Sequence, residues 1–210
     1  GLGVEVEDRE LSTYEFLVEG VPLEKVTMQT EISGLNIVPA TIDLSSADID
    51  LISNEKRSHL LHAALRKKQK DKQKYDYILI DCPPSLNILT VNAMVASHSV
   101  LIPLQSEFFA LEGLSQLLLT VKEVRQTANE NLRVEGIVLT MFDGRNNLSK
   151  QVEADARSNL RELVFKTIIP RNVRVSEAPS YSMPVLTYDP SSKGSKAYMS
   201  LAKELLANNS

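Results

Sequence analysis

A carboxylate followed by two prolines stands at the end of an apolar run in YDYILIDCPPS, Tyr75–Ser85. In open parallel sheets, ligands bind beyond the carboxyl ends of the strands. A carboxylate there can hold a magnesium ion through its water shell, beside the phosphates of a nucleotide. Asp81 is therefore a candidate metal ligand, although it could instead only cap the helix that follows. The segment that would form a phosphate-sensing switch consists of Cys82, Pro83, Pro84 and Ser85.

These residues need a sheet to position them, and the hydrophobic pattern predicts one. Short apolar runs alternate with longer stretches of helical periodicity, so we predict an α/β fold with a mostly parallel sheet flanked by helices. The predicted strands are Leu35–Val38, Tyr77–Asp81, Ser99–Leu104, Val134–Met141 and Phe165–Ile169. The predicted helices are Leu86–Ser97, Leu111–Ala128, Gln151–Leu163 and Ser195–Ala207.

Two local patterns refine this prediction. The sequence STYE at Ser12–Glu15 has the spacing of a capping box and predicts a short helix near the N-terminus. Three- and four-residue spacing predicts one buried stripe on the helix Leu111–Ala128. The residues of that stripe are Leu114, Leu117, Leu118, Val121 and Val124.

The composition is that of a soluble globular protein of one ordinary domain. Of the 210 residues, 43% are apolar and 24% are charged, and no apolar run approaches the roughly 20 residues that span a bilayer. The N-terminus lacks the pattern of a secretory signal. Cys82 is the single cysteine, which allows no internal disulfide and fits a reducing cytoplasm.

Charge is distributed unevenly along the chain. From Asn131 onward there are 11 Lys and Arg against 8 Asp and Glu, whereas the first 130 residues carry 12 against 19. This polarity suggests a polyanionic partner for the C-terminal part, although scatter over a solvated surface would also explain it. The lysine-rich tract Arg66–Lys74 is interpreted as a solvated helix end and connector.

Four long motifs carry a resemblance to a known family. They are YDYILIDCPPSL, LIPLQSEFFALEGLSQLL, GIVLTMFDGRNNLSKQV and KTIIPRNVRVSEAPSYSMPVLTYDPSSKGSKAY. Their order and content resemble the ParA/Soj family of deviant-Walker P-loop ATPases, which segregate bacterial chromosomes and plasmids. The resemblance extends over nearly the whole chain.

The resemblance implies roles for particular residues. Asp81 matches the Walker B aspartate, which makes it a candidate catalytic residue, and IDCPPS matches the switch. Met141, Pro170 and Asn172 match positions that border the adenine, although Pro170 could simply end a strand and Met141 could be core filler. The arginines implied in DNA binding that ignores sequence are Arg145 and Arg174, with Arg171 as a possible helper.

The family's phosphate loop does not occur in these 210 residues, since no glycine precedes a Gly-Lys-Ser/Thr. We therefore expect residues 1–210 to be a single domain, the C-terminal four-fifths of a ParA-type ATPase domain, with little or no ATPase activity alone. The backbone N–H groups and lysines of that loop normally neutralise the triphosphate. The alternative is a pseudo-ATPase adaptor that binds DNA or a ParB-type protein without catalysis.

By resemblance, the parent protein is a partition ATPase with ATP and Mg2+ as cofactors. Its expected partners are a second copy in an ATP-bound homodimer, double-stranded DNA bound without sequence preference, and a ParB-type protein that stimulates hydrolysis. The expected location is the cytoplasm, on the nucleoid. Membrane anchoring is not expected, because Glu204 balances Lys203 in the last helix.

Overall fold

The computed structural model describes residues 2–4, 10–52, 54–67, 75–107 and 109–209. The chain forms two compact units. The first unit comprises Gly1–Leu2, Ser99–Lys122 and Arg133–Ser210, and the second comprises Gly3–His98 and Glu123–Leu132. Each unit is described by itself below.

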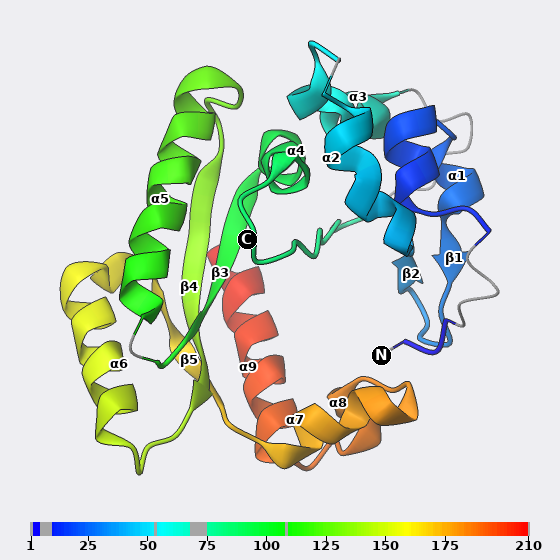
Figure 1. Ribbon diagram of the computed structural model, residues 1–210. Helices are drawn as coiled ribbons and strands as arrows, with labels where there is room; N and C mark the ends of the chain where they lie inside the picture. The colour runs from blue at the N-terminus through cyan, green and yellow to red at the C-terminus, as the bar shows by residue number, and fades with distance from the viewer. Residues whose placement is uncertain (1, 5–9, 53, 68–74, 108, 210) are drawn as a thin grey trace. The chain divides into compact units, whose positions relative to one another are not determined.

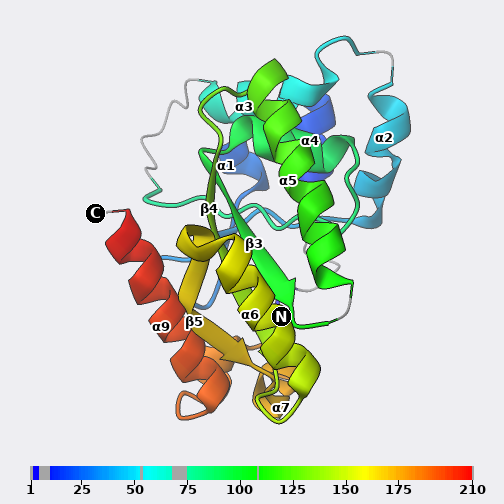
Figure 2. The same cartoon turned by 90° about the vertical axis from the view of Figure 1, so that its left-hand side faces the viewer.

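The first unit contains a parallel sheet of three strands, as Figures 1 and 2 show. The strands are β3 (Ser99–Gln105), β4 (Arg133–Phe142) and β5 (Val164–Pro170), in the order β3-β4-β5. Both pairings are parallel. The α/β class and three of the predicted strands are therefore confirmed.

Helices cover both faces of this sheet. Helices α5 (Ala110–Thr127) and α6 (Asn147–Asn159) lie on one face, and α9 (Lys193–Asn208) lies on the other (Figure 2). Side chains of a strand alternate between faces, so Ile137 and Leu139 of β4 pack toward α5 and α6. Val138 between them packs with Leu201 of α9. Because β4 is buried on both faces, its sequence GIVL is a continuous apolar run.

Two irregularities shape the strands. Gly136 lies so close to Phe165 that an added Cβ would be 2.3 Å from the ring. The pairing of β4 with β5 is also irregular. Ile137 pairs with Val164 and Leu139 pairs with Ile168, so β5 uses four residues where β4 uses two. Within that interval, the N–H groups of Lys166 and Thr167 donate to the carboxylate of Glu204 on α9, at 2.7 and 2.9 Å.

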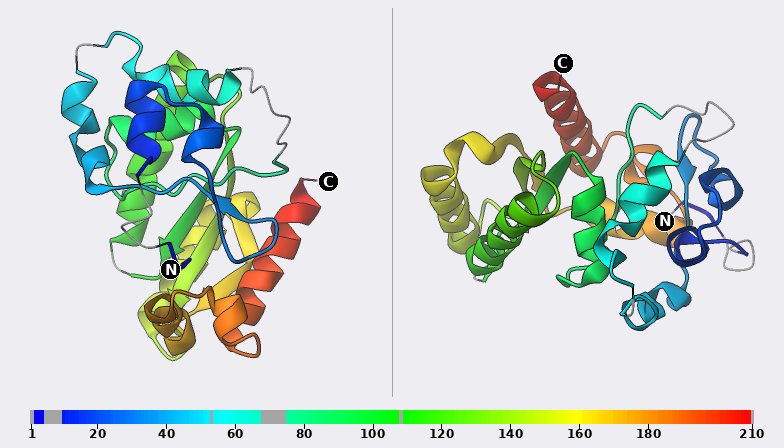
Figure 3. Two further views of the ribbon diagram at one scale, coloured as in Figure 1. Left: turned by 90° about the vertical axis from the view of Figure 1, so that its right-hand side faces the viewer. Right: turned by 90° about the horizontal axis from the view of Figure 1, so that it is seen from above.

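The second unit consists of short elements (Figure 3). Its core contains Leu17, Ala47 and Leu51. The buried amide of Asn92 joins two of its helices by accepting from the N–H of Leu61 and donating to the carbonyl of Arg57. The helical elements are Glu15–Glu19, α1 (Leu23–Val26), Ile42–Ser46, α2 (Ala47–Asp50), Arg57–His59, α3 (Leu60–Arg66) and α4 (Ile88–Ala96).

One predicted strand is wrong, and another is shorter than predicted. Tyr77–Asp81 forms no strand, and Ile78 and Leu79 are 56% and 85% exposed. A strand needs a neighbour to pair its backbone groups, and β propensity counts only in that context. The predicted parallel strand Leu35–Val38 reduces to β2 (Asn36–Ile37), which pairs antiparallel with β1 (Met28–Gln29).

The predicted helices form, most of them within two residues of their predicted bounds, and α6 ends at Asn159, four residues before its predicted end. Helix α6 begins at Asn147, four residues before its predicted start, because the side chain of Asn146 accepts from the N–H of Leu148. The capping box is confirmed, since the N–H of Ser12 donates to Glu15 at 2.7 Å and the N–H of Tyr14 donates to the Ser12 hydroxyl. The predicted stripe on α5 is buried or half-buried.

No described helix is long and apolar enough to cross a membrane. The lysine-rich tract predicted at Arg66–Lys74 lies largely outside the described residues, since residues 68–74 are not among them.

Candidate functional site

The carboxyl ends of β4 and β5 meet at one edge of the sheet in the first unit. Phe142 pairs with Pro170 there, and the N–H of Arg171 donates to the carbonyl of Phe142 at 3.0 Å. The structure thus brings together the chain segments that carry Met141 and Asn172. Ligands of open parallel sheets bind at such an edge.

Met141 has an unusual backbone conformation at this edge. Its φ is 53°, in the left-handed region that non-glycine residues seldom adopt. From Leu139 to Phe142 the strand advances three residues while β5 advances two, which is a β-bulge. Bulges redirect side chains and occur often beside active sites. Met141 is 37% exposed, so the structure does not support a role as core filler.

Asn172 begins the short helix α7 (Val173–Glu177). Its side-chain oxygen accepts from the N–H of Arg174 at 3.0 Å. Gly194 of α9 lies against this turn, since an added Cβ would be 2.4 Å from Val175 and 3.4 Å from Asn172. The close approach of α9 therefore fixes the segment that follows β5.

Arg145 follows β4 and forms a bidentate ion pair with Asp143. Its Nε and Nη2 donate to the two carboxylate oxygens at 3.0 and 2.8 Å, while 91% of the arginine side chain stays exposed. The hydrogen bond from Arg145 lowers the pKa of Asp143 from 3.8 to about 2, and the charge of Arg171 contributes to the shift. The two arginines after β4 and β5 therefore act on the same carboxylate.

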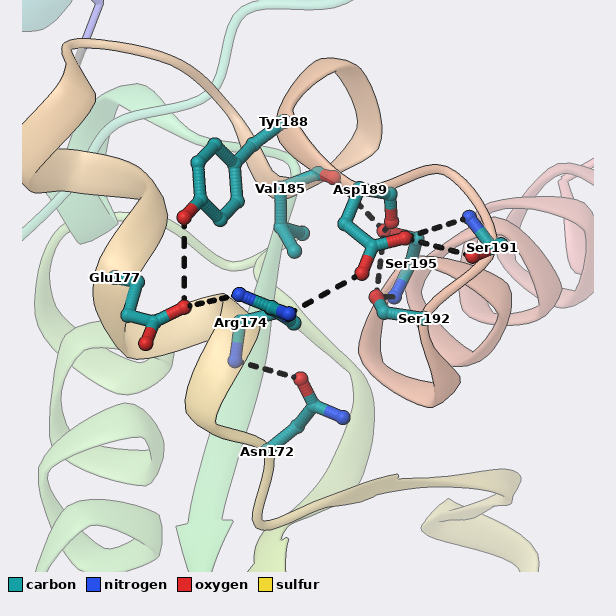
Figure 4. Close-up of polar contacts among 9 residues, drawn as sticks. All are labelled: Asn172, Arg174, Glu177, Val185, Tyr188, Asp189, Ser191, Ser192 and Ser195. Atoms are coloured by element: carbon teal, nitrogen blue, oxygen red, sulfur yellow. Dashed lines mark hydrogen bonds and ion pairs between the residues drawn. The ribbon is translucent and has the colours of Figure 1, made fainter.

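Arg174 lies between two carboxylates, as Figure 4 shows. Its Nη1 donates to Glu177 at 2.9 Å, and its Nε lies 3.4 Å from Asp189. Glu177 also accepts from the hydroxyl of Tyr188 at 3.4 Å. Arg174 itself is 53% exposed. Its guanidinium group is thus oriented by residues of α7 and of the chain that follows α8 (Val185–Tyr188).

The surroundings of this arginine are themselves held in place. Tyr188 stacks on Tyr181, with ring centroids 4.9 Å apart. One oxygen of Asp189 accepts from the N–H and the hydroxyl of Ser191, at 3.1 and 2.8 Å. The hydroxyl of the buried Ser195 donates to the carbonyl of Asp189 at 2.6 Å. Asp189 therefore has a fixed backbone and one fixed carboxylate oxygen.

Asp81 and the candidate switch lie in the second unit. Asp81 is exposed, as are Cys82–Ser85. The alternative role of Asp81 as a helix cap is wrong, because Asn87 caps α4 by accepting from the N–H of Thr90 at 3.2 Å. The hydroxyl of Thr90 donates to the carbonyl of Ser85 at 2.6 Å, which ties the end of the switch segment to α4.

Asp81 is not part of a ready-made metal site among the described residues. Among the described residues, no group of three or more His, Cys, Asp or Glu could hold a metal ion. Magnesium is commonly bound through one or two carboxylates, several waters and the phosphates of a substrate. An exposed single carboxylate fits that arrangement.

The sequence did not reveal the acidic partners of the arginines. Asp143 precedes Arg145 by two residues in a loop, and Glu177 follows Arg174 by three on a helix, a spacing that places side chains together. This spacing could have identified Glu177. Asp189 is fifteen residues from Arg174, and its approach depends on the fold of α8 and α9.

Comparison with known proteins identifies the relatives of this chain. A family model described as "AAA domain" matches residues 1–134. The chain is 49% identical over 208 residues to "Sporulation initiation inhibitor protein Soj" of Bacillus subtilis, covering 99% of this chain and 81% of that protein. It is 48% identical over 207 residues to "Chromosome partitioning protein ParA" of Caulobacter vibrioides, covering 99% and 77%.

Solved structures agree with this relationship. The structure of cobyrinic acid a,c-diamide synthase from Mycobacterium smegmatis with bound ADP and magnesium is similar, with a TM-score of 0.80 and 33% identity, covering 98% of this chain and 75% of that one. An ATP complex of Cyanothece McdA has a TM-score of 0.84 at 20% identity, covering 97% and 78%, and supports the fold alone. The chain therefore belongs to the ParA/Soj family of P-loop ATPases, whose named relatives include a chromosome-partitioning protein.

Proposed function

We propose that this protein acts in chromosome or plasmid partition as an ATP-dependent DNA-binding switch. ATP would join two copies into a homodimer that binds double-stranded DNA without regard to sequence, and a ParB-type protein would stimulate hydrolysis. The observation that carries the proposal is the 49% identity to Soj over 99% of this chain. The exposed arginines after β4 and β5 supply a surface suited to phosphate groups. Such a protein would reside in the cytoplasm, on the nucleoid.

For the nucleotide, we assign residues at the carboxyl edge of the sheet and in the switch. Met141, Pro170 and Asn172 would border the adenine, and Asp81 would hold the hydrated magnesium ion. The segment Cys82–Ser85 would respond to the γ-phosphate. When bound, magnesium neutralises negative charge on the phosphates. The two prolines restrict φ in the segment, so that a change at Asp81 would move the segment as one piece.

A chimera tests the nucleotide assignment. The phosphate-loop segment of Bacillus subtilis Soj is joined ahead of Gly1, and Mg-ATP binding is measured by titration calorimetry. We expect binding by the chimera, loss of its magnesium-dependent part in Asp81→Ala, and an unchanged melting temperature without nucleotide. Equal magnesium-dependent affinity in parent and variant would refute the role of Asp81. A chimera that binds ATP without hydrolysing it, even with a ParB-type protein, would favour the adaptor.

The DNA assignment is tested on the same chimera with Mg-ATP, because the proposed DNA-binding form is the ATP-bound homodimer. Replacement of Arg145 and Arg174 by alanine should weaken binding equally on unrelated duplexes. It should also flatten the slope of log affinity against log salt, by about 0.9 for each phosphate group that is no longer bound. Arg133→Ala is the matched control, because this half-exposed arginine begins β4 and so lies at the opposite end of the strand. An unchanged slope in the double variant would refute the DNA assignment.

A further inference from the structure

The two candidate DNA-binding arginines differ in how their N–H groups are occupied. At Arg145, one carboxylate takes Nε and Nη2, which form the side edge of the guanidinium group. The terminal edge, formed by Nη1 and Nη2, still offers N–H groups, since each terminal nitrogen carries two hydrogens. A phosphate can therefore form a bidentate pair with Arg145 while Asp143 stays in place.

At Arg174, a carboxylate lies beside each edge. Glu177 accepts from Nη1, a nitrogen of the terminal edge, and Asp189 lies 3.4 Å from Nε, a nitrogen of the side edge. A bidentate phosphate would therefore meet the negative charge of one carboxylate at whichever edge it approaches. Like charges in close contact repel one another, so a phosphate and the retained carboxylate must also occupy different edges.

The two carboxylates differ in their freedom to leave. Asp189 is 28% exposed, and its second oxygen is held by Ser191. Glu177 is 40% exposed, and the oxygen that contacts Arg174 is the one that accepts from Tyr188. Because one oxygen makes both hydrogen bonds, a rotation of the Glu177 side chain would break them together. A rotation of the Asp189 side chain would also break its two hydrogen bonds from Ser191.

We propose that Glu177 is a competitor that a DNA phosphate displaces from Arg174, while Asp189 is a positioning residue that keeps the guanidinium group in place. The inference rests on the proposed DNA-binding function. It assigns to Glu177 the role of limiting the affinity for DNA, so that the free chain does not hold duplex tightly through Arg174. Asp143 has no such role, because it contacts the side edge of Arg145 and leaves the terminal edge to a phosphate.

The test compares variants of the chimera, with Mg-ATP, by fluorescence anisotropy on two unrelated duplexes at low salt. Glu177→Gln keeps the size of the side chain and removes its charge, and should raise the affinity about two- to fivefold, the range expected for an exposed ion pair. Glu153→Gln is the matched control, since Glu153 pairs with Arg157 at 2.9 Å on α6 and the variant makes the same charge change. Its effect should be smaller than that of Glu177→Gln.

Two further variants isolate the mechanism. In the Arg174→Ala background, Glu177→Gln should add no more affinity than Glu153→Gln, because the competition no longer exists. Asp189→Asn should give no gain above Glu153→Gln, since poorer positioning of the guanidinium group offsets the removed charge. Melting curves establish that each variant is folded.

The outcomes separate the inference from the proposed function. If Arg174→Ala leaves affinity and salt slope unchanged, the assignment of Arg174 to DNA is wrong and the inference falls with it. If Arg174→Ala weakens binding but Glu177→Gln raises the affinity for DNA no more than Glu153→Gln does, the assignment of Arg174 to DNA stands and the competition is refuted. A gain that persists in the Arg174→Ala background also refutes it.

Discussion

Two apolar runs of this chain, β4 and Tyr77–Asp81, are similar in sequence and differ in structure. In β4, Ile137 and Leu139 are fully buried between β3 and β5. In Tyr77–Asp81, Leu79 is 85% exposed and no strand forms. The difference shows that an apolar run becomes a strand only where neighbouring strands satisfy its backbone and helices cover its side chains.

The largest expected effect tests this contrast directly. Leu139→Ala removes a fully buried side chain from the core formed with α5 and α6 and should reduce the free energy of unfolding by about 2–5 kcal/mol. Leu79→Ala makes the same change at an exposed position and should stay within about 0.5 kcal/mol. Urea denaturation followed by circular dichroism measures both. Equal losses would mean that Leu79 is buried in solution.

A smaller loss is expected where the backbone itself is enclosed. Gly136→Ala places a Cβ 2.3 and 2.8 Å from two carbons of the Phe165 ring. Because that ring is buried against Val138 and Leu201, it cannot move aside freely, and we expect a destabilisation of about 1–3 kcal/mol. The double variant with Phe165→Leu should recover part of the loss caused by Gly136→Ala. No interaction between the two changes would argue against the close approach.

Substitution of a glycine that has free space around it should increase the stability of the chain. Gly113 lies inside α5, and an added Cβ would meet no atom within 4 Å. Gly113→Ala should therefore stabilise the chain by about 0.4–1 kcal/mol, because alanine loses less conformational entropy in a helix. A rise in the urea midpoint at constant slope would bear this out. A fall would show that α5 has a neighbour at this position.

The smallest effect concerns charge and is read from titration. The pKa of Asp143 lies at about 2, below the ordinary 3.8, chiefly because Arg145 donates to it. The stabilising contribution of the pair is fully present above pH 3.8 and is lost as the pH falls toward 2. Carboxyl carbon shifts in NMR should show Asp143 charged at about pH 3 in the parent and half-titrated near its ordinary value in Arg145→Ala. A parent midpoint near 3.8 would contradict the pair.

The sequence allowed prediction of the elements whose pattern is local. The short apolar runs located β3–β5, the three-to-four spacing located the long helices, and STYE located its capping box. The start of α6 was missed because Asn146, one of several polar residues in DGRNN, turned out to be the cap. The strand Tyr77–Asp81 was predicted wrongly because the apolar pattern carries no information about its neighbours.

The site was predictable as a set of segments and not as a set of side-chain interactions. The motifs made Met141, Pro170 and Asn172 candidates, and the structure joins their segments through Arg171 and Phe142. The bulge at Met141 has no signal in residue type, since a left-handed methionine follows no propensity. The approach of Asp189 to Arg174 depends on tertiary folding, which spacing along the chain does not encode.

The carboxylate of Glu204 has a consequence for how copies of this chain meet. It occupies two backbone N–H groups of β5, groups that an extended strand from another molecule would otherwise recognise. A strand added along this stretch would first have to displace the end of α9. Burial acts to raise the pKa of Glu204, but the hydrogen bonds from Thr167 and Lys166 outweigh it and lower that pKa. One side chain thus occupies backbone donors that an added strand would need, without occupying the edge where the candidate residues gather.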